Sequence, residues 1–223
     1  HELRTPVARI RFGMEMLADT DDYDDRFSQL ALLDNDIDEL NKLIDEILTY
    51  AKLEQGIPVL DFEAVDLGKL LQQVVKETEA LGVKPKISLS LPENTTIVEA
   101  ERRYLHRVLQ NLAGNATRYA KSEVRLSAGI HDNYAYIAVE DDGEGIAEKD
   151  RERVFQPFTS LDDSRTRASG GYGLGLSIVS RIAFWFGGNM KVETSPSLGG
   201  AKFVMTWPIK QKHRAKVKRN EAN

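Results

Sequence analysis

The chain has 223 residues, of which 41% are hydrophobic and 29% are charged, a composition typical of globular domains. It has no cysteine, which excludes disulfides, thiol catalysis and cysteine-ligated zinc. The net charge of −5 gives no support for general nucleic-acid binding, and no apolar run has the length of a membrane span.

The first 55 residues have the pattern of two amphipathic helices. Apolar side chains recur at spacings of three and four over residues 1–19 and again over about residues 25–55. The acid-rich stretch ADTDDYDD separates the two repeats and predicts a turn. Pro6 lies inside the first repeat, so we expect a local kink there. The apolar positions are Leu3, Val7, Ile10, Met14 and Leu17, followed by Leu30, Leu33, Ile37, Leu40, Ile44, Ile47 and Ala51.

A helical hairpin of this size leaves an apolar stripe on its surface. The simplest way to bury the stripe is to pair with a second copy of the chain in a dimeric four-helix bundle. The alternative is a hairpin that packs on the rest of its own chain. We expect the dimer.

The pattern changes after Gly56 and Pro58, which interrupt the second helix and indicate a linker. Beyond about residue 60, short amphipathic helices alternate with strand-like segments, and the stretch HDN predicts a turn between two strands. We expect an α+β layer with a mainly antiparallel sheet. The predicted helices cover residues 65–81, 101–120 and 173–186, and the predicted strands cover residues 86–91, 95–100, 123–130, 134–141, 189–195 and 201–207.

Two glycine-bearing clusters lie in this second part. DDGEGI (141–146) follows a predicted strand, and GGYGLGLSIV (170–179) leads into a predicted helix. Neither is the dinucleotide-binding pattern G-x-G-x-x-G after a strand. Gly171, Gly173 and Gly175 nevertheless allow the backbone to approach a ligand closely, and the helix that follows presents free N–H groups to a phosphate.

The predicted helix over residues 101–120 supplies polar side chains that suit the same ligand. Asn111 and Asn115 are four residues apart and share a face, and amide oxygens suit a Mg²⁺ ion that carries substrate phosphates. Arg118 offers a phosphate-binding cation and Tyr119 a ring that can lie against a base. Asp141 can accept a hydrogen bond from an adenine amino group. The alternatives are solvated helix-surface side chains and, for Asp141, a simple turn at the end of a strand.

Five motifs together resemble a known family. HELRTP, NLAGNATRY, DDGEGI, FQPF and GGYGLGLSIV are similar to the H, N, G1, F and G2 boxes of bacterial sensor histidine kinases, in that order and at plausible spacing. The resemblance implies a dimerisation and histidine-phosphotransfer hairpin over residues 1–56, a linker over residues 57–66 and an ATP-binding α/β sandwich of the GHKL type over residues 67–209. The implied cofactors are ATP and Mg²⁺, with Asn115 as a metal ligand.

The resemblance also assigns roles to the first residues of the chain. His1 is expected to be the phosphoacceptor rather than the remnant of a purification tag, because a tag remnant has no reason to be followed by ELRTP on an amphipathic helix. The chemistry fits, since histidine is available near pH 7 in the neutral form that can attack a phosphoryl group. Glu2 is expected to orient the imidazole ring. Thr5 lies one helical turn along and is expected to place a water for dephosphorylating the partner. The alternative for Thr5 is an ordinary hydroxyl on the helix surface.

The nucleotide site includes a predicted lid. The stretch TSLDDSRTRASGG (159–171) has few apolar residues that could hold it, so we expect it to be mobile, with Arg165 or Arg167 contacting phosphate. The alternative is a static surface loop. The residues assigned to nucleotide binding are Asn111, Asn115, Arg118, Tyr119, Asp141, Gly143, Gly145, Phe155, Phe158, Arg165, Arg167, Gly171, Gly173, Leu174 and Gly175.

The implied partners are a second copy of the chain and the receiver domain of a response regulator, and no nucleic acid. The resemblance places the chain in the cytoplasmic part of a bacterial inner-membrane protein, anchored upstream of residue 1. Residues 210–223 carry a net charge of +5 and are expected to form a solvated, disordered tail, unless they contact an acidic partner or an anionic membrane.

Two other classes compete with this interpretation. Other GHKL ATPases, such as chaperones and topoisomerases, lack an H box, so HELRTP argues against them. A degenerate kinase that serves only as a dimeric scaffold is opposed by the motifs, because every box retains its key side chain.

Overall fold

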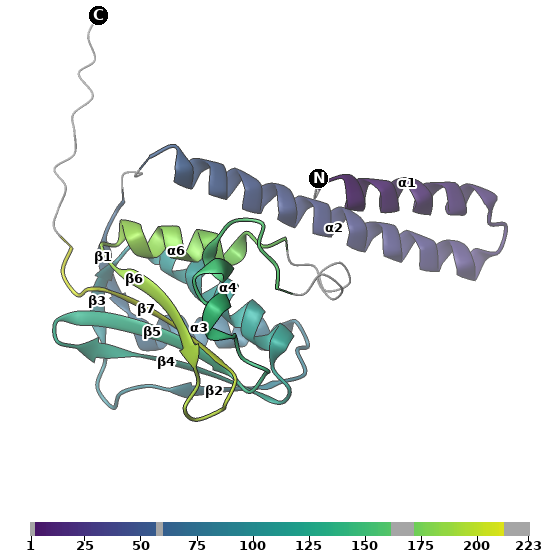
Figure 1. Ribbon diagram of the computed structural model, residues 1–223. Helices are drawn as coiled ribbons and strands as arrows, with labels where there is room; N and C mark the ends of the chain where they lie inside the picture. Colours follow the sequence, from purple (N-terminus) through teal and green to yellow (C-terminus); the bar gives the residue numbers. More distant parts are fainter. Residues whose placement is uncertain (1–2, 57–59, 162–171, 212–223) are drawn as a thin grey trace, which may run out of the picture.

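The N-terminal part of the molecule is an antiparallel helical hairpin, which projects from the rest of the chain (Figure 1). It consists of α1 (Arg4–Asp19) and α2 (Tyr23–Glu54), and both helices lie where the apolar repeats predict them. Asp22 is the N-cap of α2, and its carboxylate accepts hydrogen bonds from the backbone N–H groups of Asp24 and Asp25. The computed structural model describes residues 3–56, 60–161 and 172–211.

Pro6 lies in the first turn of α1 as described. Backbone N–H groups in a first turn have no acceptor within the helix, so the missing N–H of proline breaks no hydrogen bond there. A kink would require helical residues on both sides of Pro6, and residues 1–2 lie outside the described part of the chain. The predicted kink therefore stays a prediction.

The two helices are joined by charge pairs and by close packing. The guanidinium of Arg9 lies 2.8 Å from the carboxylate of Asp36 and is also hydrogen-bonded to Glu39. Leu33 packs over Gly13, where a Cβ atom would lie 2.7 Å from a Leu33 methyl group. Many apolar side chains of the hairpin remain exposed within the single chain. They are Leu3, Val7, Phe12, Met14, Met16, Tyr23, Phe27, Leu30, Leu32, Ile37, Ile44 and Leu48.

The rest of the described chain is an α/β sandwich, as the fold class predicted. Two short 3₁₀ turns, Glu148–Asp150 and Arg153–Phe155, lie in the loop-rich stretch before α6. No described helix has both the length and the apolarity needed to cross a membrane. The elements are β1 (Glu63–Asp66), α3 (Leu67–Ala80), β2 (Lys86–Ser90), β3 (Ile97–Ala100), α4 (Arg102–Tyr119), β4 (Glu123–His131), β5 (Tyr134–Asp141), α6 (Gly175–Trp185), β6 (Asn189–Thr194) and β7 (Ala201–Pro208).

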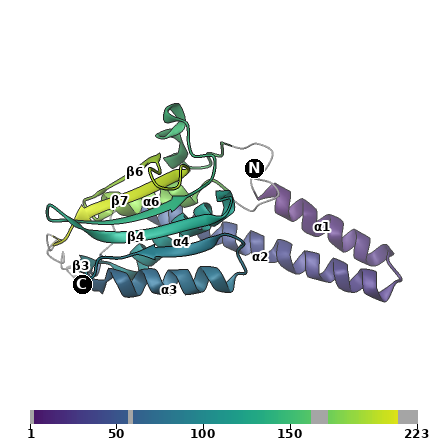
Figure 2. The same ribbon diagram turned by 90° about the horizontal axis from the view of Figure 1, so that it is seen from below.

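The main sheet has five strands in the order β2-β4-β5-β7-β6, and all its pairs except the parallel pair β2–β4 are antiparallel. Helices α3, α4 and α6 cover one face of this sheet (Figure 2), and the core lies between them. Asp132 and Asn133 form the predicted turn between β4 and β5, with φ angles of 48° and 66° that short polar residues tolerate. The mainly antiparallel sheet is thereby confirmed.

A short strand was missed by the sequence analysis. The helix was expected to begin at Val65, but Glu63–Asp66 forms β1, which pairs antiparallel with β3, and the helix α3 begins at Leu67. The carboxylate of Asp66 accepts a hydrogen bond from the N–H of Lys69 and so caps the helix. Four residues are too few to show an alternating pattern, and the strand depends on a partner about 35 residues away in the chain. The predicted linker over residues 57–66 therefore contains β1, which is a strand of the α/β sandwich.

The C-terminal half of α2 packs on the sandwich. Leu43 and Leu53 are fully buried in the same apolar cluster as the core of the sandwich. Arg181 of α6 donates a hydrogen bond of 3.2 Å to the carbonyl oxygen of Leu53 and lies 3.7 Å from the carboxylate of Glu54. Figure 1 shows α2 running over α6, on the side of the helical layer away from the sheet. The alternative of a hairpin packed on its own chain thus holds for this half of α2.

Candidate functional site

Helix α4 carries the two asparagines that the sequence analysis selected. Its apolar residues face the core, and Asn111 and Asn115 lie at the edge of that face, where both are partly accessible. The oxygen Oδ1 of Asn111 lies against the start of α6, where a Cβ atom on Gly175 would be 3.3 Å away. The nitrogen Nδ2 of Asn111 is buried and has no hydrogen-bond partner in the described structure. A buried amide in this condition is a site where a polar ligand is expected.

Asp141 ends β5 and is 3% exposed. Its Oδ1 accepts hydrogen bonds from the backbone N–H groups of Gly143, at 2.9 Å, and Ala201, at 3.2 Å. No described residue bonds to the other carboxylate oxygen, Oδ2. Burial raises the pKa of Asp141, although the two N–H donors oppose the shift. The two hydrogen bonds to Oδ1 orient the carboxylate and leave Oδ2 able to accept a hydrogen bond from a ligand.

The turn after Asp141 is tied to the end of α4. Asp142 accepts hydrogen bonds from the backbone N–H groups of Lys121, at 2.8 Å, and Ser122, at 3.0 Å. The hydrogen bonds from the hydroxyl and backbone of Ser122 hold the pKa of Asp142 well below its usual range. A Cβ atom on Gly143 would lie 2.5 Å from the carbonyl oxygen of Tyr119, so only glycine fits there. The turn that follows Asp141 is therefore held against the end of α4, where Tyr119 lies.

Gly173, shortly after the predicted lid, packs on Thr159, the first residue of that stretch. Gly173 has a φ of +71°, and a Cβ atom on it would lie 2.7 Å from the backbone nitrogen of Thr159. The N–H of Phe158 donates a 3.0 Å hydrogen bond to the carbonyl of Gly173, and Phe158 itself has a φ of 58°. Non-glycine residues rarely adopt this backbone conformation. Residues 162–171, including Arg165, Arg167 and Gly171, lie outside the described part of the chain.

The other predicted site residues occupy supporting positions. Leu174 is fully buried at the start of α6, and Phe155 packs edge-on against Phe203 with ring centroids 6.2 Å apart. Gly145 has a φ of +73° and packs against the backbone of Gly200. Arg118 is exposed at the end of α4. The structure thus brings Gly143 against the end of α4 and Gly175 against Asn111, and gives Phe155, Gly145 and Leu174 packing roles elsewhere.

The phosphoacceptor end of the hairpin is described only in part. His1 and Glu2 lie outside the described residues. Thr5 is exposed in the first turn of α1. Arg9, one turn further, has a raised pKa, chiefly because of its hydrogen bond to Glu39, and the hydroxyl of Tyr172 adds a smaller attraction. The start of α1 therefore lies on the same side of the molecule as the loop that leads into α6.

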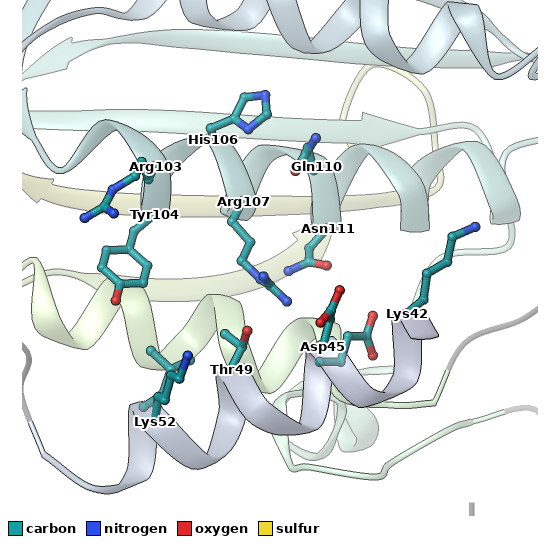
Figure 3. A pocket seen from close by; sticks show the side chains of 12 residues that line it. Lys42, Asp45, Thr49, Lys52, Arg103, Tyr104, His106, Arg107, Gln110 and Asn111 are labelled. Atoms are coloured by element: carbon teal, nitrogen blue, oxygen red, sulfur yellow. The ribbon is translucent and has the colours of Figure 1, made fainter. Parts of the chain in front are cut away.

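A polar cavity between α2 and α4 was not predicted from the sequence. It has a volume of about 540 Å³, and Asn111 and Arg107 of α4 face Asp45 and Thr49 of α2 across it (Figure 3). Glu46 also lines it, and burial raises the pKa of Glu46 against the opposing attraction of Arg107 and Arg118. The heptad-like pattern of α2 gave no sign that its polar face would meet α4.

These residues fit a magnesium nucleotide. Asn111 and Asn115 offer amide oxygens, and the orphaned nitrogen of Asn111 offers a donor. The first turn of α6 has no side-chain cap, so its N–H groups are available to a phosphate. Gly173 and Gly175 leave room for close backbone approach. No described group of three or more acidic or histidine side chains is arranged to hold a metal, so an ion here would be shared with the phosphates.

Comparison with protein families gives matches to both parts of the chain. Residues 1–56 match the His Kinase A (phospho-acceptor) domain, and residues 100–211 match the histidine kinase-, DNA gyrase B- and HSP90-like ATPase family.

Among curated proteins, the chain is 40% identical over 209 residues to sensor protein RstB of Escherichia coli K12, a match that spans 94% of the chain and 47% of that protein. It is 29% identical over 211 residues to sensor histidine kinase CpxA of the same strain, over 94% of the chain and 45% of that protein. The chain thus spans about half the length of the curated relatives it matches.

Among solved structures, full-length ShkA in complex with AMPPNP superposes with a TM-score of 0.73 at 30% identity, over 95% of this chain and 45% of that chain. The Acinetobacter baumannii histidine kinase AdeS superposes with a TM-score of 0.76 at 25% identity, over 95% of this chain and 98% of that chain. Both family models match, and the superpositions cover the hairpin as well as the sandwich. The chain therefore belongs to the sensor histidine kinases of the histidine kinase-, DNA gyrase B- and HSP90-like ATPase family.

Proposed function

We propose that the protein transfers the γ-phosphoryl group of ATP to its own His1 and then to an aspartate of a response regulator. The observation that carries the proposal is a set of close contacts among α4, the turn after β5 and the segment that leads into α6. Asn111 contacts the start of α6, Gly143 packs on the carbonyl of Tyr119, and Gly173 packs on the backbone of Thr159. Together they form a cradle lined by amides, backbone N–H groups and one buried carboxylate.

Each part of the cradle has a role in holding ATP. Asp141 accepts a hydrogen bond from the adenine amino group, and Tyr119 lies beside the base. The N–H groups at the start of α6 bind the phosphates, with Arg118 as a further cation. Arg165 and Arg167 belong to the lid, which we propose closes over the phosphates. Gly171 and Gly145 allow the backbone to follow the nucleotide closely.

Asn115, with Asn111, is proposed to hold Mg²⁺ against the phosphates, where the ion neutralises charge on the transferred group. His1 acts as the nucleophile in its neutral form, and Glu2 holds the ring in the reactive tautomer. A nitrogen–phosphorus bond forms as the bond between the γ-phosphorus and its bridging oxygen breaks, and ADP leaves. The phosphoryl group then passes to the carboxylate of the regulator.

The hairpin supplies the surfaces that are proposed to bind the partners. The exposed apolar side chains of α1 and α2 are proposed to bind the hairpin of a second chain, forming a four-helix bundle over residues 1–56. Thr5 is proposed to position water for dephosphorylating the regulator. The ATP-binding part is proposed to extend to residue 209, and the protein to act at the cytoplasmic side of a bacterial inner membrane.

Incubation with ATP labelled at the γ-phosphate tests this proposal. The protein is expected to acquire phosphate that is labile in acid and stable in base, and His1→Ala is expected to acquire none. The control is His131→Ala, because His131 is the exposed last residue of β4. ATP hydrolysis without protein labelling would favour another ATPase of the family, and binding without either activity would favour a scaffold.

A further inference from the structure

We infer that Glu140 and Ser195 are positioning residues for purine recognition. Their buried hydrogen bond holds the loop that aims the carboxylate of Asp141 at the amino group of adenine. This inference rests on the proposed function, because it takes Asp141 as the residue that contacts the base.

The pair is buried and has a short hydrogen bond. Glu140 is 6% exposed and Ser195 is 2% exposed. The hydroxyl of Ser195 donates to Oε2 of Glu140 at 2.6 Å, and the hydroxyl of Ser197 donates to the same oxygen at 3.0 Å. The ammonium of Lys202 lies 3.8 Å from Oε1. A buried carboxylate is strongly disfavoured without such partners, so both serines are held at Glu140.

The two serines fix the loop between β6 and β7. The hydroxyl of Ser195 accepts a 2.9 Å hydrogen bond from the N–H of Leu198. The backbone of Ser195 is bonded to the far end of the turn, accepting from the N–H of Gly199 at 2.9 Å and donating to the carbonyl of Gly200 at 2.8 Å. The position of the loop therefore follows from the position of Ser195.

The loop in turn orients Asp141. The N–H of Gly200 donates to the carbonyl of Asp141 at 3.1 Å, and the N–H of Ala201 donates to its Oδ1 at 3.2 Å. A Cβ atom on Gly200 would lie 2.4 Å from the same Oδ1, so the backbone of Gly200 packs directly against the carboxylate and only glycine fits there. With Oδ1 also bonded to Gly143, the carboxylate plane is set and Oδ2 is the oxygen that can face a base.

This orientation decides which purine binds. Adenine presents an amino donor where hypoxanthine presents a carbonyl acceptor. A carboxylate oxygen accepts from the amino group and repels the carbonyl, but only when it is held in line with that position. If the Ser195 loop is loosened, the carboxylate of Asp141 can rotate. The affinity for ATP then falls more than the affinity for inosine triphosphate, because the triphosphate contacts are unchanged.

Calorimetric affinities for ATP and inosine triphosphate test the inference. Ser195→Ala is expected to weaken ATP binding about tenfold, the size expected when a hydrogen bond to a charged group is lost, while the affinity for inosine triphosphate changes little. Ser197→Ala, which removes the longer of the two bonds, is expected to shift the ratio in the same direction by a smaller factor. The matched control is Ser127→Ala, because Ser127 lies on the same sheet and makes no side-chain hydrogen bond in the described structure.

Thermal melts accompany the measurement, and if Ser195→Ala fails to fold, Ser197→Ala decides the matter. A folded variant that keeps the wild-type ratio of the two affinities would overturn the inference. An equal loss for both nucleotides would also overturn it, because a purely structural role weakens both alike. Failure of the wild-type protein to bind ATP would instead overturn the proposed function.

Discussion

At the residue scale, Asn111 and Asn115 show how one helix face serves a ligand. Both flank the apolar side of α4, so the same periodicity that buries the core leaves these two residues partly accessible. Asn111 is additionally confined by Gly175, and its buried nitrogen lacks a partner. The unpartnered nitrogen of Asn111 among the described residues supports its assignment to the nucleotide.

Asn115→Ala is expected to abolish autophosphorylation while leaving the fold and the dimer intact. Losing a metal ligand raises the barrier by several kcal/mol, because the ion neutralises charge on the transferred phosphoryl group. Labelling with γ-phosphate-labelled ATP and light scattering for the dimer measure the two effects. Asn94→Ala, at an exposed asparagine of the same part of the chain, is the control. Near-normal labelling of Asn115→Ala would remove this residue from the site.

At the element scale, the contact between α2 and α4 combines buried apolar side chains with Glu46, a carboxyl group whose ionisation is disfavoured by burial. Leu43 and Leu53 fix α2 on the sandwich, and this forces Glu46 into the cavity beside Arg107. The raised pKa of Glu46 means that burial disfavours the carboxylate more than the arginines favour it. The folded protein thus holds a proton at Glu46 more tightly than the unfolded chain does.

Stability from this group is therefore fully present below the ordinary pKa of glutamate and is lost as the pH rises through the raised pKa. Glu46→Gln keeps the side chain neutral at every pH. Its melting temperature is expected to exceed that of the wild type at pH 7 and to approach it as the pH falls toward the ordinary pKa of glutamate. Asp38→Asn, on the exposed face of α2, is expected to change little. A lower melting temperature for Glu46→Gln at pH 7 would show that attraction to the arginines outweighs burial.

At the scale of the whole molecule, α2 belongs to both parts of the protein. Its C-terminal half shares the core of the sandwich, while the rest of the hairpin keeps its apolar side chains exposed for a partner. Thr5 is exposed in the first turn of α1, and His1 precedes it by four residues in the sequence, so we propose that one surface serves two reactions. In this proposal the imidazole of His1 acts in the kinase reaction, whereas a water held by the hydroxyl of Thr5 acts in a phosphatase reaction.

Thr5→Ala is expected to keep most of the autophosphorylation and to slow the removal of phosphate from the regulator. Thr5 is exposed, so alanine there removes a hydroxyl and little packing. The two rates are measured separately, with labelled ATP and with the phosphorylated receiver domain. The control is Thr95→Ala, because Thr95 is also an exposed threonine and is 90 residues from Thr5 in the sequence. Equal loss of both activities would mean that Thr5 supports the helix instead.

Local patterns in the sequence determined much of the fold. The spacing of apolar residues located α1, α2, α3, α4 and α6, because side chains three and four apart share one helix face. Alternation located β4 and β5, and the polar pair Asp132–Asn133 predicted the tight turn between them. The same spacing placed Asn111 and Asn115 together. In each case the information lies within a few neighbouring residues.

Contacts between distant segments were decided only by the tertiary structure. β1 exists because β3 pairs with it, and four residues carry no pattern of their own. The bond from the Ala201 N–H to Asp141 joins residues 60 positions apart, and the cavity at Glu46 arises where α2 meets α4. Such contacts depend on how layers pack and in what register, and a single sequence does not state either, because many partners would satisfy the same local pattern.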